Sequence, residues 1–446
     1  MKKKKVIIIL LYILIFCFFL FWNLIIQPLN IDEIWNYGFA YAISKGEVPY
    51  RDFNMILTPL YSYVMASGLK LFCPSIVILH IENAIILTTF VGICFKILKE
   101  KAYLVLLFLF FPISLSFPSY NLFILLLFSI LIYLEKNNYN DYLIGIILGL
   151  AILTKQSVGI CLSLVTVYYL IKKEWRIFIK RIVGISIPCF IFLLYLVFTK
   201  SLIHFIDLCV LGLFDFASNN TAGAFTPTYC ILFVIIILIN IALIFKNKND
   251  ITLYYSLMAL SVVLPLIDRY HFYIGFMAFL ITVLTKINNI KFINIKLFTI
   301  SILLFVIIIY STDKFNNKII YPNNINHFEY KYIDQDSIDF TNEVLNYISK
   351  NQKKEFIFLN ANAYYFRIIN DEIISYTDLI NKGNWGYDGN KKILNTLSKK
   401  KNAIFLVQKG DLAEISQTNK DILNYVIKNG KKIGNIRIYD IYILNY

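Results

Sequence analysis

Two adjacent carboxylates, Asp32 and Glu33, stand a few residues beyond the first long apolar run of the chain. Charged side chains in or beside membrane segments are costly, about 2.5–3.5 kcal/mol at a helix centre, so those that occur usually have a function. A carboxylate partly screened from water can act as a general base, and neighbouring carboxylates can bind a divalent ion. Asp32 and Glu33 are therefore candidate catalytic residues, and Asp32 is also a candidate metal ligand. A solvated loop acid, or the N-cap of a helix over 34–44, is the alternative.

Two further positions offer cations beside apolar segments. Lys155 interrupts the apolar stretch 149–159, where its ammonium could meet a phosphate oxygen as a point charge. The sequence Asp-Arg-Tyr-His over 268–271 offers Arg269, which can grip phosphate in a bidentate way, and His271, which can donate a hydrogen bond or transfer a proton. The alternatives are a lysine that snorkels to the interface and an Asp–Arg pair that caps helix ends.

The composition requires that lipid solvates most of the chain. Of 446 residues 58% are hydrophobic and only 16% are charged, which excludes a water-soluble or disordered protein. The 43 Lys and Arg exceed the 28 Asp and Glu by 15, an excess that the positive-inside rule explains without nucleic acid as a partner. Seven cysteines without C-x-x-C spacing predict neither a disulfide framework nor a zinc site.

The first membrane helix fixes the expected orientation. Four lysines at 2–5 precede an apolar run over 6–26, which is long enough to cross the bilayer and lacks a small-residue cleavage site. The lysines place the N-terminus in the cytoplasm of a multi-pass protein of the cell membrane. Further apolar stretches bring the expected number of spans to roughly eleven; they cover 76–95, 102–117, 120–134, 142–153, 157–171, 182–199, 227–245, 251–267, 272–285 and 292–310.

The loops then divide into two sets. Basic clusters fall at alternate connections, which we assign to the cytoplasm, and the candidate polar residues fall at the others. The apolar segment 55–72 could itself span, but counting it would place every later basic cluster outside. We therefore interpret it as an interfacial or re-entrant helix within a large outer loop over 27–75.

The character of the chain changes after residue 310. The part over 311–446 is rich in Asn, Lys, Asp and Tyr and contains no window that could span a bilayer. Helical spacing over 340–350 and 421–429, and strand patterns over 355–360, 403–408 and 436–444, predict a small α/β domain outside the cytoplasm. The predicted fold is thus a helical membrane domain over 1–310 followed by this soluble domain.

The outward-facing residues together indicate a class of reaction. A carboxylate with two or three cations on one face of a membrane bundle suits a lipid-linked phosphate substrate whose leaving group gathers negative charge. Glycosyl transfer from a polyprenyl carrier fits this arrangement. The main alternative is a transporter or a flippase of lipid-linked glycans, although such proteins usually carry ionisable groups near the bilayer midplane. A membrane scaffold without activity is a third class.

The motifs of the first outer loop also resemble a known family. The stretch Ile-Asp-Glu-Ile-Trp over 31–35, followed by Gly-Glu-Val-Pro-Tyr-Arg-Asp-Phe over 46–53 and Thr-Pro-Leu-Tyr over 58–61, resembles the GT-C glycosyltransferases. Within that family, the motifs resemble the branch of the ArnT-like and protein O-mannosyltransferase-like enzymes. The stretch 149–159 and the segment 268–271 are similar to weaker motifs of that branch, and the resemblance covers most of 1–310.

The resemblance implies a function for each motif. Asp32 takes the position of the catalytic acid or base with Glu33 beside it, the donor is a polyprenyl-phosphate-linked sugar, and the acceptor is an envelope glycan, lipid or protein. Divalent metal dependence varies between branches of the family. The second outer loop often carries an acid in relatives, whereas this chain has Asn121, which argues against a two-acid metal site. We assign Lys155 and Arg269 to binding of the lipid phosphate, and Tyr50 and His271 to substrate binding. Asp52 is assigned to contact with the acceptor or to ordering of the loop.

Overall fold

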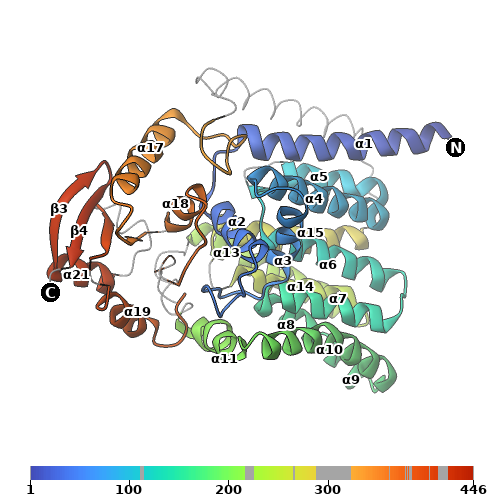
Figure 1. Ribbon diagram of the computed structural model, residues 1–446. Coiled ribbons are helices and arrows are strands. Elements are labelled where there is room, and N and C mark those ends of the chain that lie inside the picture. The colour runs from blue at the N-terminus through green and yellow to red at the C-terminus, as the bar shows by residue number, and fades with distance from the viewer. Residues whose placement is uncertain are drawn as a thin grey trace.

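A computed structural model describes most of the chain as helices packed side by side, with a small sheet at one end (Figure 1). It describes residues 2–110, 115–215, 226–264, 267–287 and 323–444, apart from 361, 377, 379, 381–383, 401 and 410–419. The apolar stretch expected over 292–310, and with it the boundary at 310, lies outside the described residues.

The membrane part consists of helices that vary widely in length. They are α1 (Lys2–Phe21), the π-helical turn η1 (Trp22–Ile26), α2 (Ile31–Ser44), α3 (Leu60–Leu71), α4 (Ile76–Leu98), the 3-10 turn η2 (Lys99–Lys101), α5 (Ala102–Phe110), α6 (Tyr120–Lys136), α7 (Asp141–Thr154), α8 (Gln156–Leu164), α9 (Val167–Ile171), α10 (Trp175–Phe198), α11 (Leu202–Phe205), the π-helical turn η4 (Ile206–Leu211), α13 (Pro227–Lys246), α14 (Ile251–Ala259), the 3-10 turn η5 (Leu260–Val263) and α15 (Arg269–Lys286).

Among the described residues, four segments are long and apolar enough to cross a membrane, namely Ile9–Ile26, Ile76–Phe110, Trp175–Phe198 and Pro227–Lys246. Shorter apolar helices lie at Asp141–Thr154, Gln156–Ile171 and Ile251–Val263. These helices support a polytopic membrane protein, whereas the expected number of eleven spans stays a prediction. Helix α3, with 12 residues, is about 18 Å long and too short to cross the hydrocarbon core. Its length favours an interfacial position.

Small residues bring α7 and α10 into close contact. A Cβ atom on Gly145 would overlap the carbonyl oxygen of Arg181, and one on Gly184 would overlap that of Tyr142. Small residues at such positions let helix backbones approach closely where lipid supplies no hydrophobic drive. The approach also buries the Arg181 guanidinium, which pairs with Glu135 at 2.5 Å and with Asp141 at 3.0 Å. This ion-paired cluster anchors the ends of three helices.

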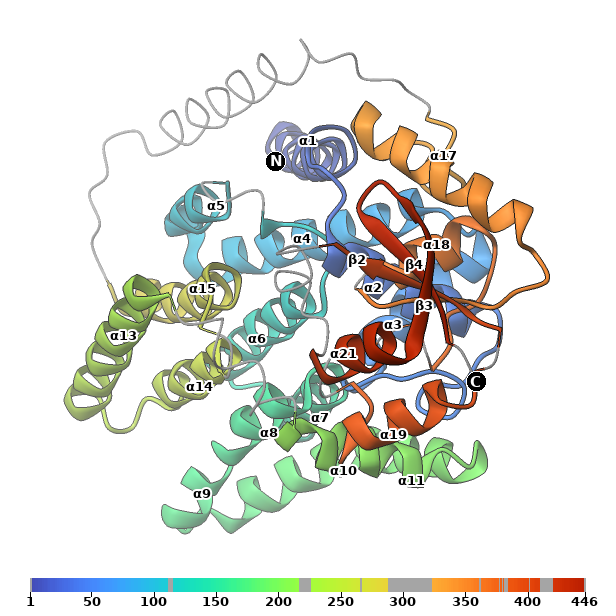
Figure 2. The ribbon, with the colours of Figure 1, turned by 90° about the vertical axis from the view of Figure 1, so that its left-hand side faces the viewer.

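The C-terminal part builds a four-stranded sheet with helices around it (Figure 2). Its elements are α17 (Gln335–Lys350), β1 (Phe356–Phe358), α18 (Ala363–Ile369), α19 (Gly389–Leu397), β2 (Ile404–Gln408), α21 (Lys420–Asn429), β3 (Gly430–Ile436) and β4 (Tyr439–Leu444). The strand order is β1-β2-β4-β3, with β1 and β2 parallel and the other pairs antiparallel. The helices expected over 340–350 and 421–429 and the strands expected over 355–360 and 403–408 form here. The strand expected over 436–444 is shorter, because a turn at 437–438 separates β3 from β4. The strand β3 was not expected, because its Gly-Lys-Lys-rich sequence lacks apolar alternation.

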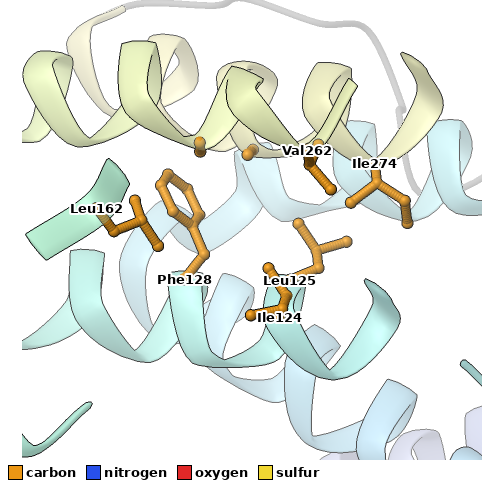
Figure 3. A pocket seen from close by; sticks show the side chains of 8 residues that line it. Ile124, Leu125, Phe128, Leu162, Val262 and Ile274 are labelled. Atoms are coloured by element: carbon orange, nitrogen blue, oxygen red, sulfur yellow. The ribbon is translucent and has the colours of Figure 1, made fainter. Parts of the chain in front are cut away.

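The core between the membrane helices is closely packed. Figure 3 shows a cavity between α6, α8 and the helices near α15, lined by side chains such as Phe128, Leu162 and Ile274. Its volume is only about 10 Å³ and its lining is apolar. A space of that size and character holds no more than one water and has no groups to bind it. This cavity is therefore a packing gap, and the chemistry lies elsewhere.

Candidate active site

The site is built around Asp32, in the first turn of α2. Asn30 is the N-cap of this helix, and its side chain accepts a hydrogen bond of 2.8 Å from the backbone N–H of Asp32. One turn later, the Asn36 amide donates to the carbonyl oxygens of Asp32 and of Pro118. The cap fixes the start of the helix, and Asn36 ties it to the second outer loop. The carboxylate of Asp32 takes no part in these backbone hydrogen bonds. Part of the residue is accessible to solvent, but the protein packed around the carboxylate removes most of the water that would stabilise its charge.

Glu33 has a different environment from its neighbour. It completes the capping box by accepting from the N–H of Asn30 at 3.0 Å, and it lies 3.2 Å from the Nζ of Lys331. Both side chains are fully buried, and Lys331 also donates to the carbonyl oxygen of Asn23 at the end of the first membrane helix. His80 Nε2 lies 3.6 Å from the Glu33 carboxylate. Glu33 therefore joins α1, α2 and the C-terminal part. The catalytic role predicted for it stays a prediction.

Asp268 brings a second carboxylate close to Asp32. It is the N-cap of α15, and it accepts from the backbone N–H and from the Nδ1 of His271, both at 2.8 Å. Burial is the main cause that raises the pKa of Asp32 to about 6, and the negative charges of Asp268 and Glu33 add to it. Burial also acts on Asp268, but the hydrogen bonds from His271 outweigh it and lower the pKa. Near neutral pH, Asp268 stays charged while Asp32 is poised to take up a proton.

Lys155 is the extended residue at the break between α7 and α8. A Cβ atom on Gly159 would overlap the backbone of Ile152, so only glycine lets the two helices meet this tightly around the break. The lysine is buried, its Nζ donates to Asn121 at 3.0 Å, and it lies over the Tyr120 ring at 5.5 Å. Burial lowers the pKa of Lys155 to about 8, and the charge of Asp268 opposes this shift. The lysine therefore points into the polar site and does not snorkel outward.

Two tyrosines complete the site and were not among the predicted site residues. The ring of Tyr120 lies beside the Lys155 ammonium, and its phenol is near enough to Asp32 to interact with its charge. Tyr270 donates to the hydroxyl of Ser119 at 2.5 Å and also lies within the field of Asp32. A Tyr-Asn pair after an apolar run is unremarkable in sequence. The second outer loop supplies site residues because the hydrogen bond from Asn36 to the carbonyl oxygen of Pro118 holds this loop against α2. The sequence does not reveal this contact.

The remaining predicted residues lie outside this cluster. Arg269 is exposed at the start of α15 and forms no ion pair with any described residue. Tyr50 is fully buried, with a left-handed backbone (φ 71°) and its hydroxyl bonded to the carbonyl oxygen of Leu57. Asp52 accepts from the N–H of Val48 and pairs with Arg51 at 2.7 Å, which lowers its pKa. Tyr50 and Asp52 thus order the outer loop.

An apolar cavity of about 610 Å³ opens next to the break between α7 and α8. Its walls come from α7, α8, α10, α11 and η4. Leu153 and Gln156, which lie before and after Lys155 in the chain, belong to these walls. The lining residues are Thr58, Ile152, Leu153, Gln156, Ile160, Cys189, Phe192, Leu193, Leu196, Leu202, Phe205, Cys209, Val210, Leu213 and Phe214. Thr58 and Gln156 are the polar exceptions, and Gln156 bonds to the outer loop at Ile56 and Thr58. The cavity thus suits a long apolar ligand.

The donor set for a metal ion is small. Within the described residues, no three His, Cys, Asp or Glu side chains are grouped to hold a metal. Asp32 and Asp268 are the carboxylates near one another here, and Asp268 already accepts two bonds from His271. A tightly held divalent ion needs more oxygen ligands than this. The role of Asp32 as a metal ligand stays a prediction, and we derive no step through a metal.

Comparison with solved structures identifies the fold. ArnT from Cupriavidus metallidurans bound to undecaprenyl phosphate superimposes with a TM-score of 0.58 at 12% identity, over 97% of both chains. Its apo form gives 0.57 at 10% identity, over 98% of both. An oligosaccharyltransferase from Archaeoglobus fulgidus gives 0.46 at 11% identity, over 97% of this chain and 73% of that one. Neither a family model nor a curated protein matches the chain. The chain therefore shares the fold of ArnT, as the resemblance to the ArnT-like branch predicts.

Proposed function

We propose that the chain is an integral-membrane glycosyltransferase that moves a sugar from a polyprenyl-phosphate donor to an acceptor hydroxyl. The observation that carries the proposal is a carboxylate whose pKa is raised to about 6, Asp32, which shares the neighbours Asp268 and Tyr120 with a buried lysine, Lys155. Leu153 and Gln156, beside this lysine in the chain, line an apolar cavity. The fold shared with ArnT, a protein solved with undecaprenyl phosphate, agrees with a substrate of this class.

Asp32 is the general base of the proposed reaction. Its carboxylate takes the proton of the acceptor hydroxyl while that oxygen forms a bond to the anomeric carbon of the sugar. The bond between this carbon and the phosphate oxygen breaks, and the electron pair leaves with the polyprenyl phosphate. A base with a pKa near working pH is mostly ionised yet still basic enough, and such a group commonly contributes 10²–10⁴-fold.

Lys155 stabilises the phosphate of the leaving group. The phosphate gathers negative charge as the bond to the sugar breaks, and a cation placed beforehand in a site screened from water lowers the energy of that state. Lys155 is held towards the site by Asn121 and Tyr120. His271 is near enough to Lys155 to interact with its charge. The side chain of Arg269 is exposed and can reach a bound phosphate from the solvent side. We assign all three to phosphate binding.

The apolar cavity offers a place for the isoprenoid chain next to this phosphate site. Leu153 and Gln156 line the cavity on either side of Lys155 in the sequence. A lipid bound there would bring its phosphate towards the lysine with its tail against α10 and η4. The identity of the sugar and of the acceptor does not enter this argument.

The test detects cleavage of the bond between the sugar and the phosphate of the donor. The full-length protein in nanodiscs is given a panel of polyprenyl-phosphate sugars together with envelope lipid and glycan acceptors, and released polyprenyl phosphate is quantified by mass spectrometry. We expect release that depends on both protein and acceptor. Release without any acceptor dependence would contradict transfer to a hydroxyl. Movement of the intact donor across a vesicle membrane, with no bond broken, would assign the chain to the flippases instead.

A further inference from the structure

The four strands of the C-terminal sheet bring many lysines to one of its ends. The register runs across the sheet through Phe356, Ile404, Ile443 and Lys431. This row lies at the amino ends of β1, β2 and β3 and at the carboxyl end of β4. Neighbouring strands lie about 4.8 Å apart, so the row is roughly 15 Å wide. Segments distant in sequence thus meet at this end.

Lysines crowd the connections that enter this row. We name them the basic end; it comprises Lys350, Lys353, Lys354, Lys399, Lys400, Lys428, Lys431 and Lys432. All are exposed except Lys400, which is partly exposed. Lys400 pairs with Glu355 at 2.8 Å and Lys432 with Asp440 at 2.9 Å. The others form no ion pair with any residue that the structure describes.

The opposite end of the same sheet is richer in carboxylates, and Lys409 and Arg437 lie there with them. Arg437, at the turn between β3 and β4, donates to the Glu343 side chain and to the Asp336 carbonyl oxygen, and so fixes the acidic helix α17 there. Asp339 lies on the same helix. Lysines thus outnumber carboxylates at the basic end, where Glu355 is paired with Lys400, whereas charges of both signs meet at the opposite end. Excess lysine spread evenly over the surface would not produce this difference.

Protection of sheet edges does not explain the basic end. Lysines on an exposed edge strand block pairing with other chains, and Lys431 and Lys432 on β3 could do that. Lys353, Lys354 and Lys399, however, lie in the connections before β1 and β2 and not along a strand. They add positive charge at one point without covering an edge, which suits a partner with several closely spaced negative charges.

The basic end lies away from the membrane helices. The carboxyl end of β1 leads to α18, where the ring of Tyr364 packs so closely on α2 that a Cβ atom on Gly38 would lie 2.8 Å from it. The basic end is at the other end of the same strand. In Figure 1 the C-terminus, close to α21 and β3, lies far from the N-terminus of α1. A soluble polymer can reach this position more easily than a bilayer surface.

We propose that the basic end binds a linear polyanion, a polymer with closely spaced phosphate groups. Such a partner could be the acceptor of the proposed transferase, but the binding itself does not depend on that activity. The phosphates would meet the lysines as point charges, and binding would weaken as salt rises because counterions are released.

Binding of labelled inorganic polyphosphate to the full-length protein in neutral detergent tests the proposal. The variant Lys354→Gln/Lys431→Gln removes one exposed cation from each side of the row. We expect its dissociation constant to rise roughly three- to tenfold, as for the loss of two exposed ion pairs. The matched control Lys70→Gln/Lys391→Gln removes two exposed, unpaired lysines from α3 and α19 and should leave binding unchanged. Both variants should keep the melting temperature of the wild type.

Three outcomes would overturn the proposal. The first is equal binding by both variants, and the second is no binding of polyphosphate by the wild type at low salt. The third comes from amine labelling in nanodiscs. Protection of Lys354 and Lys431 by anionic lipid, relative to neutral lipid, would assign the basic end to the membrane surface. Because none of these readouts measures sugar transfer, their failure is distinguishable from failure of the proposed function.

Discussion

Asp32 and Lys155 carry the chemistry at the scale of single residues, since their burial brings two very different groups into the same pH range. Asp32 must be deprotonated to accept a proton, which requires a pH above about 6. Lys155 must be protonated to stabilise the phosphate, which requires a pH below about 8.

The first prediction concerns pH. Transfer measured as kcat/KM for the donor should follow a bell-shaped profile with its maximum between pH 6 and 8, falling on the acid side as Asp32 is protonated and on the alkaline side as Lys155 loses its proton. The profile of Lys155→Arg should lose the alkaline limb and keep the acid one. A rate that rises steadily to pH 10 in the wild type would contradict the role of the lysine.

The second prediction concerns the phosphate contact. Lys155→Ala should lower kcat/KM for the donor by roughly ten- to hundredfold, the value expected for a charge-assisted contact, and should leave the melting temperature near that of the wild type. Lys70→Ala, at an exposed lysine on α3, is the matched control. An unchanged dependence on donor concentration in Lys155→Ala would remove this residue from the phosphate site.

At the scale of elements, the start of α2 depends on a lysine that comes almost three hundred residues later. Lys331 pairs with Glu33, and the N–H of Tyr332 donates to the carbonyl oxygen of Leu24, so the C-terminal part clamps both α1 and α2. The sequence predicts the helix and its acidic first turn. It could not predict the clamp, because a lysine within a polar tail has no local pattern that marks it for burial.

The third prediction tests this clamp. Lys331→Met leaves the Glu33 carboxylate buried without its cation, which should destabilise the fold by about 3–5 kcal/mol. The double variant Glu33→Gln/Lys331→Met removes both charges and should recover most of the loss. The partly exposed ion pair between Lys400 and Glu355 provides the control. Lys400→Met should lower the free energy of unfolding by less than about 1 kcal/mol. Thermal melting in detergent measures all three. Equal destabilisation by the single and double variants would show that the charge pair is not what holds the elements.

The same dependence on packing explains which site residues the sequence could reveal. Asp32 and Lys155 stand out as charges among apolar residues. Asp268 looked like one half of a helix-capping pair, and it does cap α15, but only the packing of α15 brings it near Asp32. Arg181 looked like one of several basic loop residues, and only the close approach of α7 and α10 shows that it is buried and paired.

At the scale of the whole molecule, the outward-facing chemistry depends on the topology. The charge rule predicts that the basic connections, such as the one at Lys99, face the cytoplasm and that the C-terminal domain faces outward. The structure arranges the site and the sheet at the same ends of the helices, as Figure 1 shows for α2 and α18, and this arrangement agrees with one active face. The orientation itself stays a prediction.

The fourth prediction tests this orientation in intact cells. In a cysteine-free background, Lys99→Cys should resist a membrane-impermeant maleimide and react only after permeabilisation. Tyr387→Cys, at an exposed position of the C-terminal part, should react without permeabilisation. Labelling of the cysteine at 99 from outside would mean that the segment 55–72 spans, and it would invert the assigned loops.

The central claim is that Asp32 removes the proton of the acceptor, and one substitution tests it most directly. Asp32→Asn keeps the size and the backbone contacts of the residue but cannot act as a base, so acceptor-dependent release of polyprenyl phosphate should fall by 10²–10⁴-fold. Asp339→Asn, on the exposed surface of α17, should retain the wild-type rate. Undiminished release by Asp32→Asn, in protein that melts like the wild type, would contradict the account.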